Sequence, residues 1–113
     1  MKLGRDLTRT VYGCTREKRF AKDIPLVDQI RRACVSITSN IAEGFDAQSN
    51  AEFVRFLNYS RRSVSEVKNQ LYVALDEGYI SQNEFERLYD LASRISKMLF
   101  GFTRYLKSSL AQK

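Results

Sequence analysis

Apolar residues recur every three or four positions along four long stretches of this chain, and that spacing constrains its fold more than any other feature. Such spacing lines one face of an α-helix, whereas a strand needs alternation at every second residue. A single proline and five glycines interrupt the 113 residues, so long helices are free to form. The pattern predicts an all-α chain with helices over about 3–18, 25–43, 50–77 and 82–108.

Each expected helix has one apolar face, and together these faces predict one core and a single domain over 1–113. Ser60 is the one polar member of the four faces. They consist of Leu3, Leu7, Val11 and Cys14; of Leu26, Ile30, Ala33, Cys34, Ile37 and Ile41; of Phe53, Leu57, Ser60, Val64, Val67, Leu71, Ala74 and Leu75; and of Phe85, Leu88, Leu91, Ala92, Ile95, Leu99, Phe102 and Leu106.

Signals for helix ends separate the four stretches. A break is expected over 19–25, where Asp23 can cap a helix whose first turn holds Pro25. We expect Gly44 and Gly78 to end the second and third helices, since glycine accepts the left-handed conformation found there. The last residues, 109–113, are expected to form a frayed tail.

The third and fourth helices open on capping boxes, in which a serine and a glutamate three residues later satisfy free backbone donors. These pairs are Ser49 with Glu52 and Ser81 with Glu84, and Ile80 with Phe85 adds a hydrophobic staple to the second. The connections near 44–49 and 78–81 are short, so neighbouring helices must run antiparallel. The expected architecture is an antiparallel up-down-up-down four-helix bundle.

The composition argues against several classes of function. The chain has no histidine, so it lacks a Ser-His or Cys-His nucleophile pair, and its glycines stand too far apart for a phosphate loop. Cys14 and Cys34 are too few for a zinc site, and we expect them to be free buried thiols rather than a disulfide. No apolar run approaches 18 residues. We therefore expect a cytoplasmic protein that is not an enzyme and has no cofactor, metal or membrane partner.

Two polar stripes flank the apolar faces of the second and third helices. A fully solvated stripe is expected opposite the core, so flanking stripes can meet each other or another subunit. An intramolecular network and a subunit interface both remain open, with Arg32–Glu66 and Ser36 or Asn40 with Ser63 as expected pairs. The stripes consist of Gln29, Arg32, Ser36, Asn40 and Glu43, and of Tyr59, Ser63, Glu66 and Gln70.

Basic residues gather toward both ends of the chain, which carries a formal net charge of +6. The first and fourth helices should be neighbours in the bundle, so their charges can form one surface that contacts nucleic-acid phosphates. A merely solvated face is the alternative. The candidate residues are Arg5, Arg9, Arg16, Lys18, Arg19 and Lys22 at the first end, and Arg87, Arg94, Lys97, Arg104 and Lys107 at the second.

Seven phenylalanines and six tyrosines are many for this length. Val54 and Tyr72 fall away from the apolar face of the third helix, and Phe100 and Tyr105 fall away from that of the fourth. Large apolar side chains outside the core stripe indicate a second surface that becomes buried. We expect self-association.

The stretch from Gln29 to Phe45, QIRRACVSITSNIAEGF, is similar to the signature of a known family. Its pattern, close to Q-x-R-R-A-x-x-S-I-x-x-N-I-A-E-G, is that of the four-helix-bundle rRNA intervening-sequence proteins. Further matches follow in the third and fourth helices over roughly 20–106. They include Glu52-Phe53, Arg55-Phe56-Leu57, Ser63-x-x-Glu66, Gln70-Leu71, Gly78-Tyr79-Ile80, Lys97-Met98-Leu99 and Gly101.

The resemblance implies a bacterial protein that assembles as a ring, typically a homopentamer, without established catalytic activity. Relatives of this family include basic accessory proteins of diversity-generating retroelements, which bind a reverse transcriptase and nucleic acid. This chain departs from the pattern at Arg62, where a small residue is usual, and in the shorter first helix, which lacks a tryptophan. It also has Asp46-Ala47-Gln48 where a basic residue often follows, which removes one possible phosphate contact.

Two hypotheses follow from the residues and the resemblance together. The first is a ring-forming, non-enzymatic protein that binds RNA or DNA phosphates through its basic surfaces, as an accessory factor. The alternative is a protein-interaction scaffold that docks a partner such as a reverse transcriptase, without touching nucleic acid. The residues leave the ring size and the choice between RNA and DNA open.

Overall fold

A computed structural model describes the backbone of residues 1–111 and the side chains of residues 1–108. It contains helices α1 (Lys2–Thr15), α2 (Lys18–Lys22), α3 (Ile24–Phe45), α4 (Asn50–Asp76) and α5 (Gln82–Ala111). The molecule is a long rod of 53 × 21 × 20 Å. Its radius of gyration, 15.3 Å, exceeds the value of about 13 Å typical of a chain of this length.

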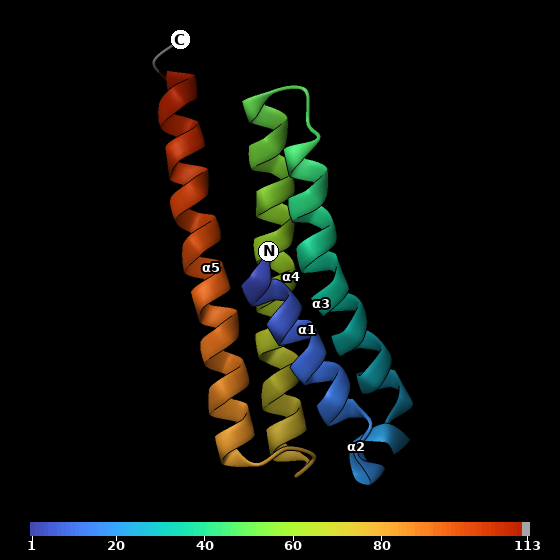
Figure 1. Cartoon of the computed structure of the whole chain (residues 1–113). Coiled ribbons are helices and arrows are strands. Elements are labelled where there is room, and N and C mark those ends of the chain that lie inside the picture. Colours follow the sequence, from blue (N-terminus) through green and yellow to red (C-terminus); the bar gives the residue numbers. More distant parts are fainter. Residues whose placement is uncertain (112–113) are drawn as a thin grey trace.

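The helices form the expected antiparallel bundle (Figure 1). α4 packs against both α3 and α5, while α1 lies in front and packs between α3 and α5. α3 and α5 are not among the closely packed helix pairs, although the rings of Phe45 and Phe102 lie 6.3 Å apart between them. The short α1 starts halfway along the rod, so only one half of the molecule has four helices in cross-section.

We call this part the four-helix half. The other part, the three-helix half, contains α3 from Thr38, α4 as far as Leu57 and α5 from Met98. Met1, at the start of α1, lies at the boundary between the two.

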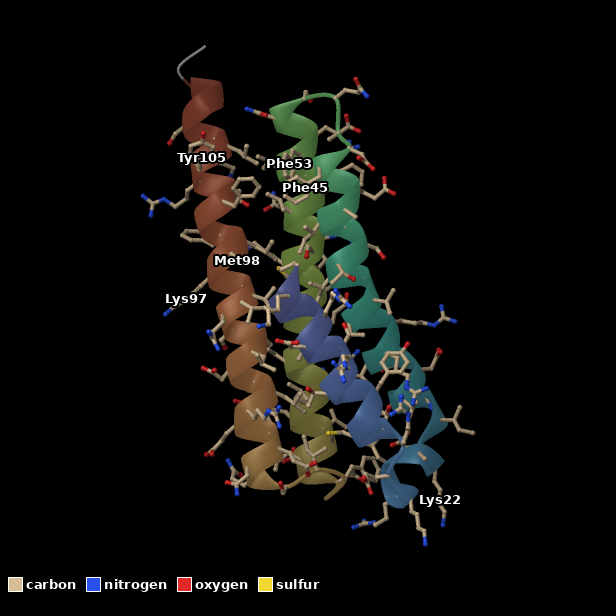
Figure 2. The ribbon with its side chains drawn as sticks, in the orientation of Figure 1. Lys22, Phe45, Phe53, Lys97, Met98 and Tyr105 are labelled. Atoms are coloured by element: carbon tan, nitrogen blue, oxygen red, sulfur yellow. The ribbon has the colours of Figure 1, made fainter. Side chains whose placement is uncertain are left out.

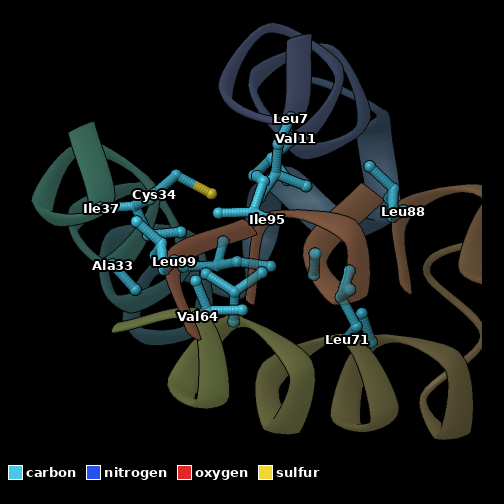
Figure 3. Close-up of a cluster of buried hydrophobic side chains, with 14 of the residues drawn as sticks. Leu7, Val11, Ala33, Cys34, Ile37, Val64, Leu71, Leu88, Ile95 and Leu99 are labelled. Atoms are coloured by element: carbon cyan, nitrogen blue, oxygen red, sulfur yellow. The ribbon is translucent and has the colours of Figure 1, made fainter. Parts of the chain in front are cut away.

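The four-helix half contains a continuous apolar core. Leu7 and Val11 of α1 point toward Ile95 of α5 and toward the α3 residues Cys34 and Ile37 (Figure 3). The predicted apolar faces form this core: most members are buried, and Leu3, Phe53, Leu75, Leu91 and Phe102 pack against it while partly exposed. The helical periodicity therefore identified the core faces correctly.

Ser60, the one polar member of those faces, is fully buried. Its hydroxyl donates a hydrogen bond of 2.8 Å to the carbonyl oxygen of Ile37. A buried hydroxyl without a partner costs free energy, so this bond explains how a serine is accommodated between α4 and α3.

The helix starts agree with the sequence signals. Asp23 Oδ1 accepts a bond of 3.3 Å from the backbone N–H of Leu26, with Pro25 in the first turn of α3. Ser49 Oγ accepts a bond of 3.2 Å from the Glu52 N–H. The second capping box is complete, since Ser81 and Glu84 exchange bonds of 2.8 and 3.1 Å. Each bond satisfies a donor that the first helical turn leaves free.

The end of the first helix was predicted wrongly. α1 ends at Thr15 rather than at 18, and the expected break over 19–25 contains the short helix α2. In a continuous helix Phe20 would lie about 120° away from the Cys14 face. The chain instead turns at Glu17, which is extended, and Phe20 is buried with its ring stacked 5.1 Å from that of Tyr79.

Gly44 does not end α3, contrary to the prediction. It lies inside the helix, and a Cβ atom there would come within 2.7 Å of Phe53 Cδ1. Its role is close contact between α3 and α4. Gly78 is the glycine with positive φ, +74°, and it follows α4 as expected.

The expected frayed tail over 109–113 is also wrong for residues 109–111, because α5 continues as far as Ala111. The remaining residues, 112–113, lie outside the described part of the chain. No helix of the described part is long and apolar enough to cross a lipid bilayer.

Candidate nucleic-acid and subunit interfaces

The predicted neighbourhood of α1 and α5 brings three of the candidate arginines together. Arg9 of α1 and Arg87 and Arg94 of α5 line one surface hollow of about 610 Å³. Asp6 and Asp90 line it too, and Asp90 lies 4.0 Å from Arg94. The hollow is therefore basic but partly neutralised.

The other predicted basic residues spread along the rod instead of joining that hollow. Arg5 is exposed on α1, and Arg16 lines a separate hollow of about 450 Å³ together with Arg9 and Tyr12. Lys18 and Lys22 are exposed on α2 at one end of the molecule, where Figure 2 labels Lys22. Lys97, Arg104 and Lys107 lie on exposed positions of α5.

Arg19 has a structural contact. Its Nη2 donates to the carbonyl oxygen of Glu77 at 3.2 Å, and its guanidinium lies 6.0 Å from the ring centroid of Tyr79. Arg19 thus satisfies a carbonyl that the end of α4 leaves free. It joins α2 to the α4–α5 turn and is less available to a ligand than its neighbours.

Sequence reasoning named Arg104 and Phe100 separately, but it missed that they belong to a row of cations above aromatic rings between α4 and α5. Arg61 and Arg104 lie 5.0 and 5.9 Å from the ring centroid of Phe100. Lys68 lies 4.9 Å from that of Tyr89. We call these five residues the cation–aromatic seam. Its signal was spread over two helices far apart in sequence, so charge counting along one helix could not detect it.

The polar stripes meet each other in part. Ser63 Oγ of α4 donates to Ser36 Oγ of α3 at 2.9 Å, and Asn40 Nδ2 donates to the same oxygen at 3.0 Å. The expected contact of Ser63 with Ser36 is therefore present within one chain. Hydroxyls that bond across a helix pair favour one register of α3 against α4.

The charged ends of the stripes do not pair as expected. Arg32 Nε lies 3.0 Å from Asp28 Oδ2, one turn earlier on the same helix, rather than bonding Glu66. Arg32 and Glu66 instead line a shallow hollow of about 430 Å³ together with Gln29, Ser36 and Gln70. Glu43 and Tyr59, the remaining stripe members, are exposed.

Arg31, which the signature contains but the site prediction left out, has a clear role in packing. Its Nε donates to Thr15 Oγ1 at 2.9 Å, and its guanidinium lies 4.4 Å from the ring centroid of Tyr12. Arg31 therefore fastens α3 to the end of α1.

An apolar groove lies between α3 and α5 in the three-helix half, beyond the start of α1. It holds about 650 Å³, and its lining has no charged side chain. Figure 2 shows Phe45 and Met98 on its two sides. The lining residues are Met1, Thr38, Ile41, Ala42, Phe45, Leu57, Met98, Leu99 and Phe102.

Aromatic rings extend this groove toward the end of the rod. Phe45 packs 5.1 Å from Phe53 and 6.3 Å from Phe102, whose ring stacks on Tyr105. Phe45 and Tyr105 remain 67% and 66% exposed. Phe100 and Tyr72 are exposed as predicted, whereas Val54 is buried between the helices and was assigned to the surface wrongly.

Both cysteines are buried and unpaired with each other, as expected. Burial raises the pKa of the Cys34 thiol to about 12. Burial also raises the pKa of Cys14, to about 11, and the nearby Glu84 carboxylate, which accepts its S–H at 3.6 Å, adds to that rise. Neither thiol is a reactive thiolate near neutral pH.

Comparison with known proteins identifies relatives of this bundle. A family model described as 23S rRNA-intervening sequence protein matches residues 1–101. A crystal structure of a protein with unknown function from the S23 ribosomal protein family of Bacteroides thetaiotaomicron is similar, with a TM-score of 0.79 and 24% identity. The similarity covers 90% of this chain and 92% of that one, and at this identity it speaks to the fold alone. No curated protein matches the chain.

Proposed function

The chain belongs to the 23S rRNA-intervening sequence protein family, and from that premise we propose that it is a self-assembling, non-enzymatic protein that binds nucleic-acid phosphates. The observation that supports the proposal best is the hollow between α1 and α5. Arginines from two helices, Arg9, Arg87 and Arg94, face one concave surface there. Guanidinium groups grouped in this way suit phosphate oxygens.

The physical basis is release of counterions. Each phosphate that an arginine neutralises frees condensed cations, so affinity falls steeply as salt rises. Asp6 and Asp90 weaken the field in the hollow, which suits a contact that positions a backbone without reading its sequence. The formal charge of +6 acts in the same direction at longer range.

The test measures binding of labelled RNA and of duplex DNA at two salt concentrations. We expect binding at low salt that weakens at least tenfold at the higher salt. Arg9→Gln/Arg94→Gln should lower affinity and reduce the salt slope by about two contacts. A matched variant, Arg55→Gln/Arg62→Gln, removes two exposed charges from α4 and should have a smaller effect. Absence of binding by the wild-type protein at low salt would refute the proposal.

Self-assembly is the second part of the proposal, with a homopentamer as the expected ring. The accessible surface of 7089 Å² exceeds the roughly 6,400 Å² expected of a 13.1 kDa monomer. The excess accords with the rod shape, which leaves the groove between α3 and α5 uncovered. The apolar groove supplies the surface that assembly would cover, since Phe45 and Met98 lie open there.

Light scattering at several concentrations tests assembly. The wild-type protein should have a mass that is a multiple of 13.1 kDa. Met98→Glu places a charge in the groove and should lower that mass, because an unpaired charge at an interface is costly. Ile24→Glu is the matched control on an exposed apolar residue of α3 far from the groove. A wild-type monomer at the highest concentration would contradict self-assembly.

A protein-interaction scaffold is the second candidate function, and the same groove favours it. An uncharged groove between two helices suits the apolar face of a helix from another protein. A wild-type monomer that fails to bind RNA or DNA at low salt would support this candidate over the first.

A further inference from the structure

The cation–aromatic seam forms a second surface on α5, away from the hollow that contains Arg9. Tyr89 and Phe100 lie along the same side of α5, about 16 Å apart by helix geometry. Each ring has a cation of α4 close to it, Lys68 and Arg61 respectively. The seam therefore alternates flat apolar rings and positive charges along one line.

The seam is open to a ligand. Phe100 is 47% exposed although it is a large aromatic residue, and Arg104 on the same helix is also exposed. Arg61 forms no ion pair among the described residues, and its buried Nε has no hydrogen-bond partner. Its guanidinium charge is thus free to act on a group placed over the ring of Phe100.

Carboxylates are kept away from the Phe100 end of the seam. Between Arg55 and Leu75, α4 has one acidic residue, Glu66, which faces α3 in the hollow with Arg32. Between Tyr89 and Lys107, α5 has one acidic residue, Asp90, which faces α1 in the hollow with Arg9. At the Phe100 end neither helix therefore adds a carboxylate to the seam, in contrast to the α1–α5 hollow, while the exposed Glu86 lies one turn before Tyr89 at the other end.

We infer that the seam binds unpaired bases of a single-stranded nucleic acid, a step that rests on the proposed function and names its ligand class. Aromatic rings provide stacking surfaces for bases, and interleaved cations attract the adjoining phosphates. Phe100 is the principal stacking residue, because it is the exposed ring between two arginines. Arg61 and Arg104 hold the phosphates on either side.

The geometry also explains why this ligand is single-stranded. In a duplex the base faces are stacked on one another, so an exposed ring cannot reach them without unstacking a step, which costs free energy. In a single strand each base has a free face. Lys97 lies between the seam and the Arg94 side of α5, so one strand can touch both surfaces.

The experiment measures fluorescence anisotropy of a single-stranded RNA and of a duplex of the same length, over a range of salt. Phe100→Leu keeps apolar bulk but removes the ring. It should weaken single-strand binding roughly 5- to 150-fold, the equivalent of one lost base stack, and leave the salt slope and duplex binding unchanged. Phe100→Tyr should bind like the wild type.

Two controls separate stacking from folding and from charge. Tyr105→Leu removes a more exposed ring from α5 that has no cation over it among the described residues, and it should leave the ratio of single-strand to duplex affinity unchanged. Circular dichroism of each variant checks that the bundle is intact. Arg61→Gln/Arg104→Gln should reduce the salt slope, which Phe100→Leu should not.

Three results would overturn the inference. If Phe100→Leu binds the single strand as the wild type does, while arginine variants lose affinity, phosphate binding stands and stacking is wrong. If poly-glutamate of equal charge displaces the RNA as well as a second RNA does, the bases contribute nothing. If the wild type binds neither nucleic acid at low salt, the proposed function fails together with the seam.

Discussion

The two halves of this rod are built from the same three long helices, but they bury their apolar residues to different extents. In the four-helix half, α1 packs over the space between α3 and α5, and Leu7 is fully buried there. In the three-helix half no fourth helix covers that space, and the equivalent residues form a groove of about 650 Å³. An apolar helix face therefore predicts that its residues become buried, but it does not show whether the same chain or another molecule buries them.

The largest expected difference between the halves is the cost of removing an apolar side chain. Leu7→Ala should lower the free energy of unfolding by about 2–5 kcal/mol, since it leaves a cavity in a closed core. Met98→Ala, at a position 43% exposed, should cost less than about 1 kcal/mol in dilute protein. Urea denaturation followed by circular dichroism measures both. Equal costs at low concentration would mean that the groove is not open in the single chain.

Two glycines of the three-helix half should change the stability by smaller amounts and in opposite directions. Gly44→Ala should destabilise the protein by about 1–3 kcal/mol, because its Cβ would meet the ring of Phe53 at 2.7 Å. Gly101→Ala meets nothing within 4 Å and should stabilise by about 0.5–1 kcal/mol through helix propensity. Thermal unfolding of both variants tests this contrast. A stabilising Gly44→Ala would show that α3 and α4 can separate slightly at no cost.

The smallest expected effect concerns pH and the closed end of the four-helix half. The Ser81 N–H donates to the Glu84 carboxylate and holds the pKa of that carboxyl below its usual value. A lowered folded pKa means that the stabilisation is complete above about pH 4.3 and is lost as pH falls through the folded pKa.

Glu84→Ala should therefore cost about 0.5 kcal/mol near neutral pH, the low end for a cap at an exposed position, and much less at acid pH. Glu84→Gln, which keeps an acceptor for Ser81 without a charge, should vary less with pH than the wild type. Denaturation midpoints at neutral and acid pH provide the measurement. A cost of Glu84→Ala that stays constant with pH would argue against the carboxylate as the acceptor.

Periodicity and capping signals predicted most of the fold because they are local. Ser81 and Glu84 are three residues apart, and the position of Ile95 relative to Leu99 follows from helix geometry alone. These features do not depend on which helix packs nearby. The helix starts and the buried faces could therefore be predicted from sequence, and the comparison with a solved relative agrees with the resulting bundle.

The failures all involve partners far away in the sequence. Phe20 lies outside α1, on the separate helix α2, because its ring stacks on that of Tyr79. Gly44 was interpreted as a helix stop, although its small size serves the approach of Phe53. Val54 is covered although it lies off the main apolar face of α4. Local pattern alone does not contain these pairings.

The basic surface was only partly predictable for a geometric reason. Arg104 lies roughly 100° round α5 from Arg87, so one helix distributes its charges between two neighbours. Arg87 joins Arg9 of α1, while Arg104 joins Arg61 of α4 above Phe100. Counting charges along α5 predicted one surface, whereas the fold divides it into two.

The contacts of α2 and of the residue after it join the helices at one end of the rod. Phe20 stacks on Tyr79, the Tyr79 hydroxyl donates to Asp23 at 2.9 Å, and Arg19 bonds the Glu77 carbonyl. Both turns at that end are tied by hydrogen bonds as well as by stacked rings. The opposite end is joined by the rings of Phe45, Phe53 and Phe102, without a hydrogen bond between helices among the described residues. Local opening of the helices therefore begins at the far end, so amide protons of α3 near Ile41 exchange with solvent before those near Ile30.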